Sequence, residues 1–240
     1  MSFRRVSCGY VCAGLLLGFA SFAPAQSSSS SKSAKQTLKP STAANSPLDS
    51  GSVNNGIYRN AAFGFTCKIP AGWVLRTEEM NARDDSESAS KDSRAALDRA
   101  AGGACPYKGG CGRVLLAAFS RPPEAHGEDI NSSILIAAES ASAYPGLKDP
   151  AQYFGPLTEV AKAQGFASDQ DTYEFPIGTK TLVRGDFEKD VATRRMLQST
   201  LVTLARGYAV SFTFIGGTED EVEDLVQGLS FGAAAKPHSR

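Results

Sequence analysis

The chain has 240 residues, of which 25 are basic and 25 acidic, and 42% of its residues are hydrophobic. A balanced charge leaves no basic excess to bind a phosphate backbone, so we expect no nucleic-acid partner. The hydrophobic content is ordinary for a globular protein, and the roughly 175 residues that remain after the N-terminal segments below predict one well-buried domain.

Residues 1–25 have the three parts of a secretory signal peptide. Arg4 and Arg5 form a basic stretch, an apolar segment centred on residues 11–20 follows, and residues 23–25 have the small-x-small pattern of a cleavage site. The apolar segment is short for the ~20 residues of a membrane-spanning helix. We therefore expect cleavage, export to the periplasm or outside the cell, and no stable membrane span afterwards. A retained anchor is the alternative.

The next segment, residues 26–55, contains an unbroken serine run at 27–31 and few apolar side chains. Such a composition cannot offset the entropy of ordering, so we expect a disordered serine-rich linker. The folded domain is then predicted over residues 56–232, followed by a flexible tail over 233–240.

Cleavage of the signal would leave three of the five cysteines. Cys105 and Cys111 flank a glycine-containing spacer, and in an oxidising compartment we expect them to form a disulfide. The alternatives are a metal site, which would need further ligands, a redox pair, which usually has a closer spacing, and free thiols. Cys67 alternates with Phe65 and Ile69, which predicts a buried, unreactive thiol.

Apolar runs with turn-forming flanks predict strands in the first half of the domain, at residues 58–69, 114–119 and 134–138. A charged, alanine-rich stretch over 77–101 predicts one or two surface helices, of which residues 93–101 are the better part.

A further helix is predicted to begin at Asp149 and Pro150, a capping residue followed by proline, and to end at Gly165. Pro156 conflicts with a continuous helix because it cannot donate a backbone hydrogen bond and its ring clashes with the preceding turn. We expect the helix to kink or restart there.

Three strands are predicted next, at residues 179–188, 193–204 and 208–215, with a tight hairpin turn at 205–207. A last helix is predicted from a capping box formed by Thr218 and Glu221. Its apolar stripe consists of Val222, Leu225, Val226 and Leu229.

Strands that follow one another through short turns indicate an antiparallel sheet. The predicted fold class is therefore α+β, with helices that precede and follow the strands covering both faces of the sheet.

The domain opens with a pattern of aromatic, glycine and proline residues, namely Tyr58, Asn60, Gly64, Phe65, Pro70, Gly72 and Trp73. Together with the order of elements, this pattern resembles the PsbP-like superfamily, whose namesake is an extrinsic subunit of photosystem II. The resemblance covers most of residues 56–232 and implies an α/β/α sandwich around an antiparallel sheet. It also implies a binding or assembly role, and it supplies no catalytic residues.

The sequence contains no Gly-x-Ser-x-Gly elbow, no His-Glu-x-x-His motif and no phosphate-binding glycine loop. His126 lies near Glu124, Glu128 and Asp129, which could form a weak metal site, but a solvated polar loop is the simpler interpretation. We therefore expect no catalytic, cofactor-binding or metal-binding residues.

Two charged groups have structural interpretations. The acidic residues over 219–224 suit a helix N-terminus and a polar outer face. Arg194 and Arg195 could hold an anion, but an exposed pair on a strand explains them as well.

These observations favour an exported, non-enzymatic binding or assembly module of the cell envelope. It would hold an envelope protein or a small ligand on a sheet face or in a groove beside the helices. Two alternatives remain: an envelope enzyme whose site assembles from scattered polar residues in a deep pocket, and a structural spacer domain.

Overall fold

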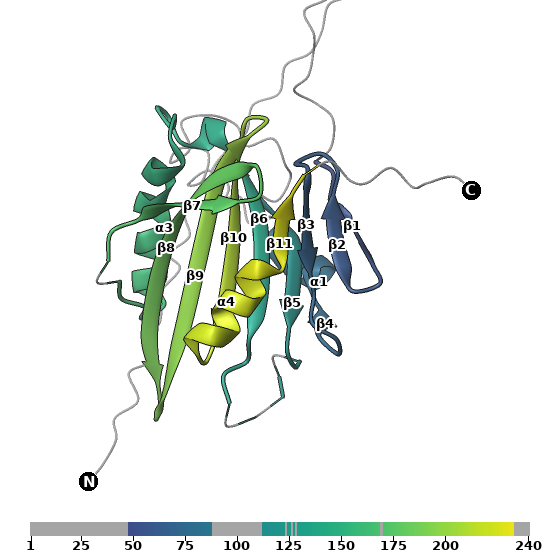
Figure 1. Ribbon diagram of the computed structural model, residues 1–240, viewed down its shortest axis with the longest axis vertical. Helices are drawn as coiled ribbons and strands as arrows, with labels where there is room; N and C mark the ends of the chain where they lie inside the picture. The colour runs from purple at the N-terminus through teal and green to yellow at the C-terminus, as the bar shows by residue number, and fades with distance from the viewer. Residues whose placement is uncertain are drawn as a thin grey trace, which may run out of the picture. The chain divides into compact units, whose positions relative to one another are not determined.

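A computed structural model describes the chain over residues 48–87, 112–122, 124–125, 127, 129–168 and 170–232. Several predictions fall outside these ranges: the signal peptide, residues 26–47 of the linker, the helix over 93–101, the disulfide of Cys105 and Cys111, His126 and the C-terminal tail. The described residues fold as an α+β domain, which confirms the predicted fold class (Figure 1).

The strands form two antiparallel sheets. The smaller sheet has the order β1-β2-β3-β11, and the larger has the order β4-β5-β6-β10-β9-β8-β7. Their bounds are β1 Ser52–Asn54, β2 Ile57–Asn60, β3 Phe65–Lys68, β4 Val74–Leu75, β5 Gly112–Phe119, β6 Ser133–Ser140, β7 Tyr173–Ile177, β8 Lys180–Val191, β9 Arg194–Ala205, β10 Tyr208–Gly216 and β11 Leu229–Phe231.

Helical segments lie between the strands along the chain. They are α1 Thr77–Glu87, α3 Phe154–Ala163 and α4 Glu219–Gln227, with the 3₁₀ segments η1 Ala141–Ala143 and η2 Pro150–Tyr153. Within the described ranges, none of these helices has the length and apolar character needed to cross a membrane.

The main core lies between the two sheets and is continued by α4. Phe212 of β10 meets Phe65 of β3 edge-on, with ring centroids 4.9 Å apart, and Phe231 of β11 at 5.7 Å. Burying an aromatic side chain of this size contributes roughly 1.5–3 kcal/mol. The three rings therefore tie the small sheet to the centre of the large one.

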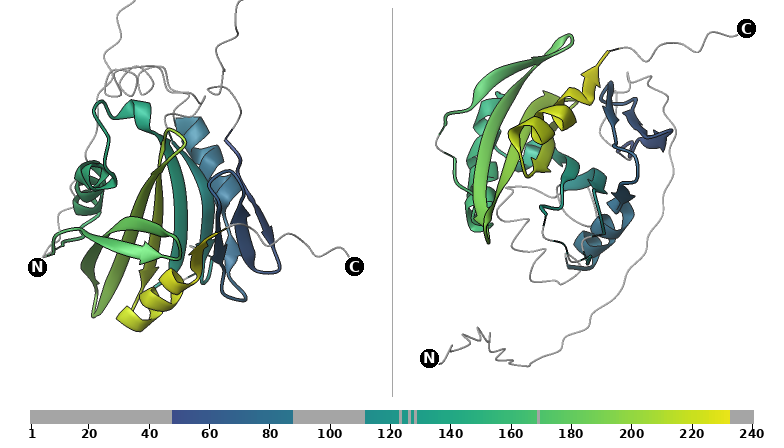
Figure 2. Two further views of the ribbon diagram at one scale, coloured as in Figure 1. Left: turned by 45° about the horizontal axis from the view of Figure 1, so that its top comes forward. Right: turned by 60° about the horizontal axis from the view of Figure 1, so that its bottom comes forward.

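The opposite face of the large sheet packs against η2 and α3 (Figure 2). Tyr153 and Phe154 cover Phe187, Val202 and Ala209 of the central strands. Helical segments thus cover both faces of the large sheet, as the sequence predicted. The small sheet, which covers the same face of the large sheet as α4 does, was not predicted.

Five predicted strands are confirmed, as β5, β6, β8, β9 and β10. The predicted strand over residues 58–69 is two strands, because the chain turns between β2 and β3. In that turn the Asn60 side chain accepts a hydrogen bond from the Phe63 amide, and Gly64 has a φ of 72° that favours glycine. Asn60 is fully buried, which gives a structural reason for its place in the opening pattern.

Two other predictions are wrong, and one is confirmed. β1 lies within the segment predicted as linker and pairs with β2, so the ordered chain starts before residue 56. The helix predicted from Asp149 restarts at Phe154, as expected near Pro156. Pro156 then lies in the first turn of α3, where a backbone N–H has no intrahelical partner and its absence costs little. Leu229 does not continue the stripe of the last helix, since it begins β11 and pairs with Cys67.

Cys67 is buried between the sheets, as predicted. Burial raises the pKa of its thiol to about 12, so the reactive thiolate is disfavoured in the folded protein.

Candidate ligand-binding site

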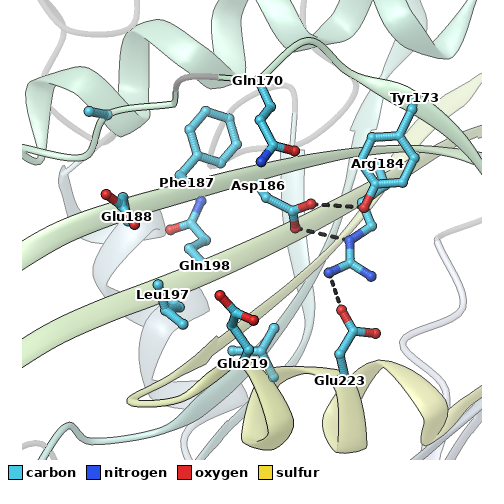
Figure 3. A pocket seen from close by; sticks show the side chains of 12 residues that line it. Gln170, Tyr173, Arg184, Asp186, Phe187, Glu188, Leu197, Gln198, Glu219 and Glu223 are labelled. Carbon is cyan, nitrogen blue, oxygen red and sulfur yellow. Dashed lines mark hydrogen bonds and ion pairs between the residues drawn. The ribbon is translucent and has the colours of Figure 1, made fainter.

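A hollow of about 330 Å³ lies between the outer strands of the large sheet and the first turns of α4 (Figure 3). Its size falls within the range of small-ligand pockets. The described residues that line it are Ala167, Gln170, Tyr173, Arg184, Asp186, Phe187, Glu188, Leu197, Gln198, Glu219, Val222 and Glu223.

The hollow forms beside a stretch of β8 that has no paired residues on its outer edge. Tyr173 pairs with Arg184 at the start of β7, and an isolated bridge joins Ala167 to Glu188. Between these two pairings, the chain passes through residues 168–172 opposite only three residues of β8. The extra length carries Gln170 away from the strand edge and leaves space beside it.

Strand alternation places Arg184, Asp186 and Glu188 on one face of β8. Leu182, Arg184, Asp186 and Glu188 follow one another at every second position, and their exposure increases in that order from the core to solvent. Leu182 belongs to the core between the sheets, so the same face carries the charges toward α4. An arginine is thus buried at the boundary between the core and the hollow.

Helix α4 supplies the opposite wall. Thr218 caps the helix by accepting a hydrogen bond from the Glu221 amide at 3.2 Å, as predicted. The reciprocal half of the predicted capping box differs, because the Glu221 carboxylate accepts from the Gly217 amide at 2.9 Å and from the Ser132 hydroxyl. This cap fixes the start of the helix. Glu219 and Glu223, which are four residues apart and so lie on the same side of α4, both face the hollow.

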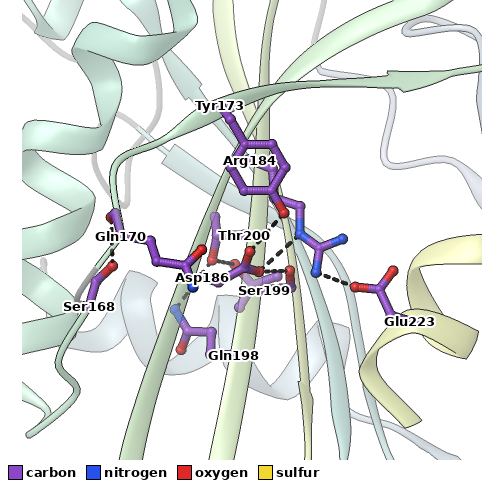
Figure 4. A network of polar contacts seen from close by, with 10 residues as sticks. Ser168, Gln170, Tyr173, Arg184, Asp186, Gln198, Ser199, Thr200 and Glu223 are labelled. Atoms are coloured by element: carbon purple, nitrogen blue, oxygen red, sulfur yellow. Dashed lines mark hydrogen bonds and ion pairs between the residues drawn. The ribbon is translucent and has the colours of Figure 1, made fainter. Parts of the chain in front are cut away.

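Arg184 is held between two carboxylates (Figure 4). Its Nε donates to Asp186 Oδ1 at 2.9 Å, and its Nη2 donates to Glu223. The Arg184 side chain is 7% exposed, whereas Asp186 and Glu223 are 33% and 42% exposed. The guanidinium therefore lies inside, and the two carboxylates face solvent.

Asp186 also accepts two hydroxyl hydrogen bonds. Tyr173 donates to Oδ2 at 2.9 Å, and Ser199, which pairs with Asp186 across β8 and β9, donates to Oδ1. With Arg184, these donors fix the orientation of the carboxylate. Burial and the hydrogen bond to Asp186 raise the pKa of Tyr173 to about 12, so its hydroxyl remains a donor at neutral pH.

Two aromatic rings pack on the guanidinium. The Arg184 Cζ lies 5.0 Å from the centroid of Phe175 and 6.0 Å from that of Tyr173, within the range of cation–π attraction. Burial lowers the pKa of Arg184, but its hydrogen bonds to Glu223 and Asp186 outweigh burial and raise that pKa above its ordinary value. Arg184 thus keeps its charge.

The described lining of the hollow carries one arginine and four carboxylates: Asp186, Glu188, Glu219 and Glu223. Arg195 lies outside this lining and pairs with Glu188 at 3.2 Å. No hydrogen bond or ion pair joins the Glu219 carboxylate or the Gln170 amide to another described side chain. The hollow is therefore acidic, with polar groups still available for bonding.

A larger hollow, of about 950 Å³, lies between β1, α1 and β5. Val53 and Leu75 on its walls are exposed apolar side chains. We place the candidate site at the smaller hollow, because charged and polar side chains converge there.

Most residues that the sequence singled out lie elsewhere. Arg194 pairs with Asp129 at 2.9 Å, so it forms an exposed surface ion pair, as expected. His126 and the pair Cys105 and Cys111 fall outside the described ranges. The acidic stretch over 219–224 was interpreted only as the start and outer face of a helix, but two of its residues, Glu219 and Glu223, also line the hollow.

Sequence reasoning missed Arg184 and Asp186, although their strand was predicted. Two charged residues that alternate with an apolar Leu182 in a strand indicate that charge lies on the buried face. That signal was available and would have pointed to this site.

We do not interpret the hollow as a metal site. Among the residues that the structure describes, no three His, Cys, Asp or Glu side chains have the arrangement needed to hold a metal ion.

Comparison with known proteins gives weak similarities. No protein-family model matches the chain, and no curated protein matches it significantly. LpqN of Mycobacterium tuberculosis, involved in cell envelope biogenesis, is 15% identical over 69% of this chain and 82% of that chain, with a TM-score of 0.34. The Ran-binding protein Mog1p of Saccharomyces cerevisiae is 13% identical over 75% and 86%, with a TM-score of 0.36. At these TM-scores the similarities support no conclusion about the chain's function.

Proposed function

We propose that the chain is an exported, non-enzymatic binding module of the cell envelope, and that it holds its ligand or partner in the hollow beside α4. Membership of the PsbP-like superfamily is part of this proposal. It is supported by the opening pattern and by an antiparallel sheet with helical segments on both faces.

The observation that carries the proposal is the fixed network around Arg184. Asp186 receives hydrogen bonds from Arg184, Tyr173 and Ser199, so its orientation is set before a ligand arrives. Polar groups that are already ordered lose little conformational entropy on binding, and ordered groups beside a hollow are what a specific binding site requires.

An envelope enzyme is the second candidate, favoured by the convergence of Asp186, Glu219 and Glu223 on one hollow. Paired carboxylates can act as general acid and base when their environments differ. The binding role is preferred because Asp186 already accepts hydrogen bonds from Arg184, Tyr173 and Ser199, so this network accounts for the carboxylate without a catalytic role.

The test is site-specific photo-crosslinking in the cells that produce the protein. A photoreactive residue in place of Gln170 lies at the mouth of the hollow, where no described side chain bonds the native amide. We expect a reproducible adduct, a protein or a small molecule, identified by mass spectrometry.

The matched control places the same photoreactive residue at Asp224, which is exposed on α4 and does not line the hollow. Equal labelling from both positions, or none from position 170, would contradict a binding role for the hollow. Turnover of a captured molecule by the wild type but not by Asp186→Asn would favour the enzyme instead.

A further inference from the structure

We infer that the hollow takes an alkylammonium group, as carried by a lysine side chain or a polyamine. The inference rests on the proposed binding function and specifies the chemistry of its ligand. Three properties of the hollow lead to it: its uncompensated charge, its unbonded acceptors and its apolar wall.

The charge of the lining excludes an anion. Arg184 is the one cation among the described lining residues, and its Nε and Nη2 are committed to Asp186 and Glu223. Glu219 has no compensating partner within the described residues. An incoming anion would meet four carboxylates and one arginine, so it would be repelled, whereas a cation would be attracted.

The acceptors suit an ammonium group. An ammonium carries three N–H donors, each of which needs an acceptor when it leaves water. Figure 3 shows Glu219 directed from α4 toward the strands, while Gln170 approaches from the far side of β8. The carboxylates of Asp186 and Glu223 keep lone pairs beyond those that bind Arg184. Acceptors are therefore available from three sides.

Part of the wall is apolar. Leu197 and Val222 line the same hollow on the α4 side of the sheet, and together they offer a surface for methylene groups. Long cationic side chains bind in this manner, with the stem on apolar surface and the charged end among polar groups. Hydrocarbon beside carboxylates distinguishes an alkylammonium ligand from a bare inorganic cation, which would gain nothing from the apolar wall.

Arg184 provides an internal precedent. Its guanidinium is bound by Asp186 and Glu223 and packs on Phe175 and Tyr173. The carboxylates of Asp186 and Glu223 thus already stabilise one partly desolvated cation, and both line the hollow beside it.

The experiment uses isothermal titration calorimetry on the full mature chain. The probes are spermidine, a neutral peptide with one central lysine, and the same peptide with norleucine in place of lysine. Norleucine keeps the methylene stem and lacks the charge, so we expect its peptide to bind about tenfold more weakly or not at all. Binding of the charged probes should weaken as salt is raised.

Glu219→Gln removes the unpartnered carboxylate with little change of shape, and Asp224→Asn removes the same charge from the outer face of α4. We expect Glu219→Gln to weaken binding about tenfold and Asp224→Asn to weaken it less than about twofold. Binding of only spermidine or only the lysine peptide would support the shared chemistry and identify the source.

Equal binding of the lysine and norleucine peptides, no binding of either charged probe, or equal effects of the two variants would overturn the inference. An adduct at position 170 in cells together with no binding of charged probes would reject the alkylammonium ligand and leave the binding site standing. Absence of both would reject the site itself.

Discussion

Two clusters that join a carboxylate to tyrosines lie on opposite faces of the large sheet. On the face toward α4, Asp186 accepts from Tyr173 and binds Arg184. On the other face, Glu139 of β6 accepts from Tyr144, whose ring meets that of Tyr153 edge-on with centroids 5.1 Å apart. The clusters share their chemical groups and differ in how the negative charge is balanced.

The first cluster balances its carboxylates with a buried cation, and the second balances one carboxylate with phenol hydroxyls. The second is also filled: a Cβ on Gly112 would lie 2.7 Å from Glu139 Cγ, and Tyr153 is only 2% exposed. The first borders a hollow and keeps unbonded acceptors. The difference shows that a buried polar network marks a binding site only where it leaves space and bonding capacity.

The largest effect should come from removing the cation of the first cluster. Arg184→Met leaves Asp186 and Glu223 without their partner, which costs several kcal/mol when the charges are fully buried. Because solvent reaches both carboxylates, we expect the free energy of unfolding to fall by about 3 kcal/mol, measured by urea denaturation. Arg195→Met, which breaks an exposed pair, should cost less than about 1 kcal/mol. Equal losses would show that burial of Arg184 contributes nothing.

A second experiment separates the clusters by pH. Burial, and then the negative charge of Glu139, raise the pKa of Tyr153, and burial with Glu139 also raises that of Tyr144. The folded state therefore holds these protons more tightly than the unfolded state. The resulting stabilisation is complete below about pH 10, the ordinary tyrosine pKa, and is lost as the pH rises toward the folded values.

Tyr153→Phe should cost about 1–2 kcal/mol at neutral pH, because it removes one hydroxyl from the cluster. It should also make the free energy of unfolding fall less steeply between about pH 9 and about pH 11. Urea denaturation at the two pH values provides the measurement. An unchanged pH dependence would mean that Tyr153 does not hold its proton more tightly when folded.

The smallest effect concerns the helix that supplies Glu223 to the first cluster. Thr218→Ala removes the hydroxyl that caps α4 and should lower stability by about 1 kcal/mol. Thr218→Ser keeps the cap and should restore most of that loss. A deficit that serine does not reduce would assign the effect to the lost methyl group.

Local patterns predicted most of the fold because strands and helix caps are determined by residues that are close together in the sequence. The strand over residues 208–215 and the cap at Thr218 each depend on one short segment, and both were confirmed. β11 was missed because Leu229 fits the spacing of the helical stripe as well as a strand of three residues. Only its pairing with Cys67, far back along the chain, decides between the two.

The site was harder to predict for the same reason. Arg184 and Asp186 lie in a predicted strand, but their meaning depends on Glu223, which is 39 positions away on a helix. Which face of the strand meets that helix is set by packing between the sheets, and no local pattern encodes it. The charged residues are visible in the sequence, but the contact between Arg184 and Glu223 could not be predicted from it.

The pairing of β11 with β3 has a consequence for how the chain acquires its structure. Phe231, near the end of the described chain, completes a sheet whose other members lie near its start, so that sheet has no finished edge until the last residues are available. Contacts of such long sequence separation form slowly, since a large loop must close first. The small sheet is therefore completed late in folding, after β11 has become available.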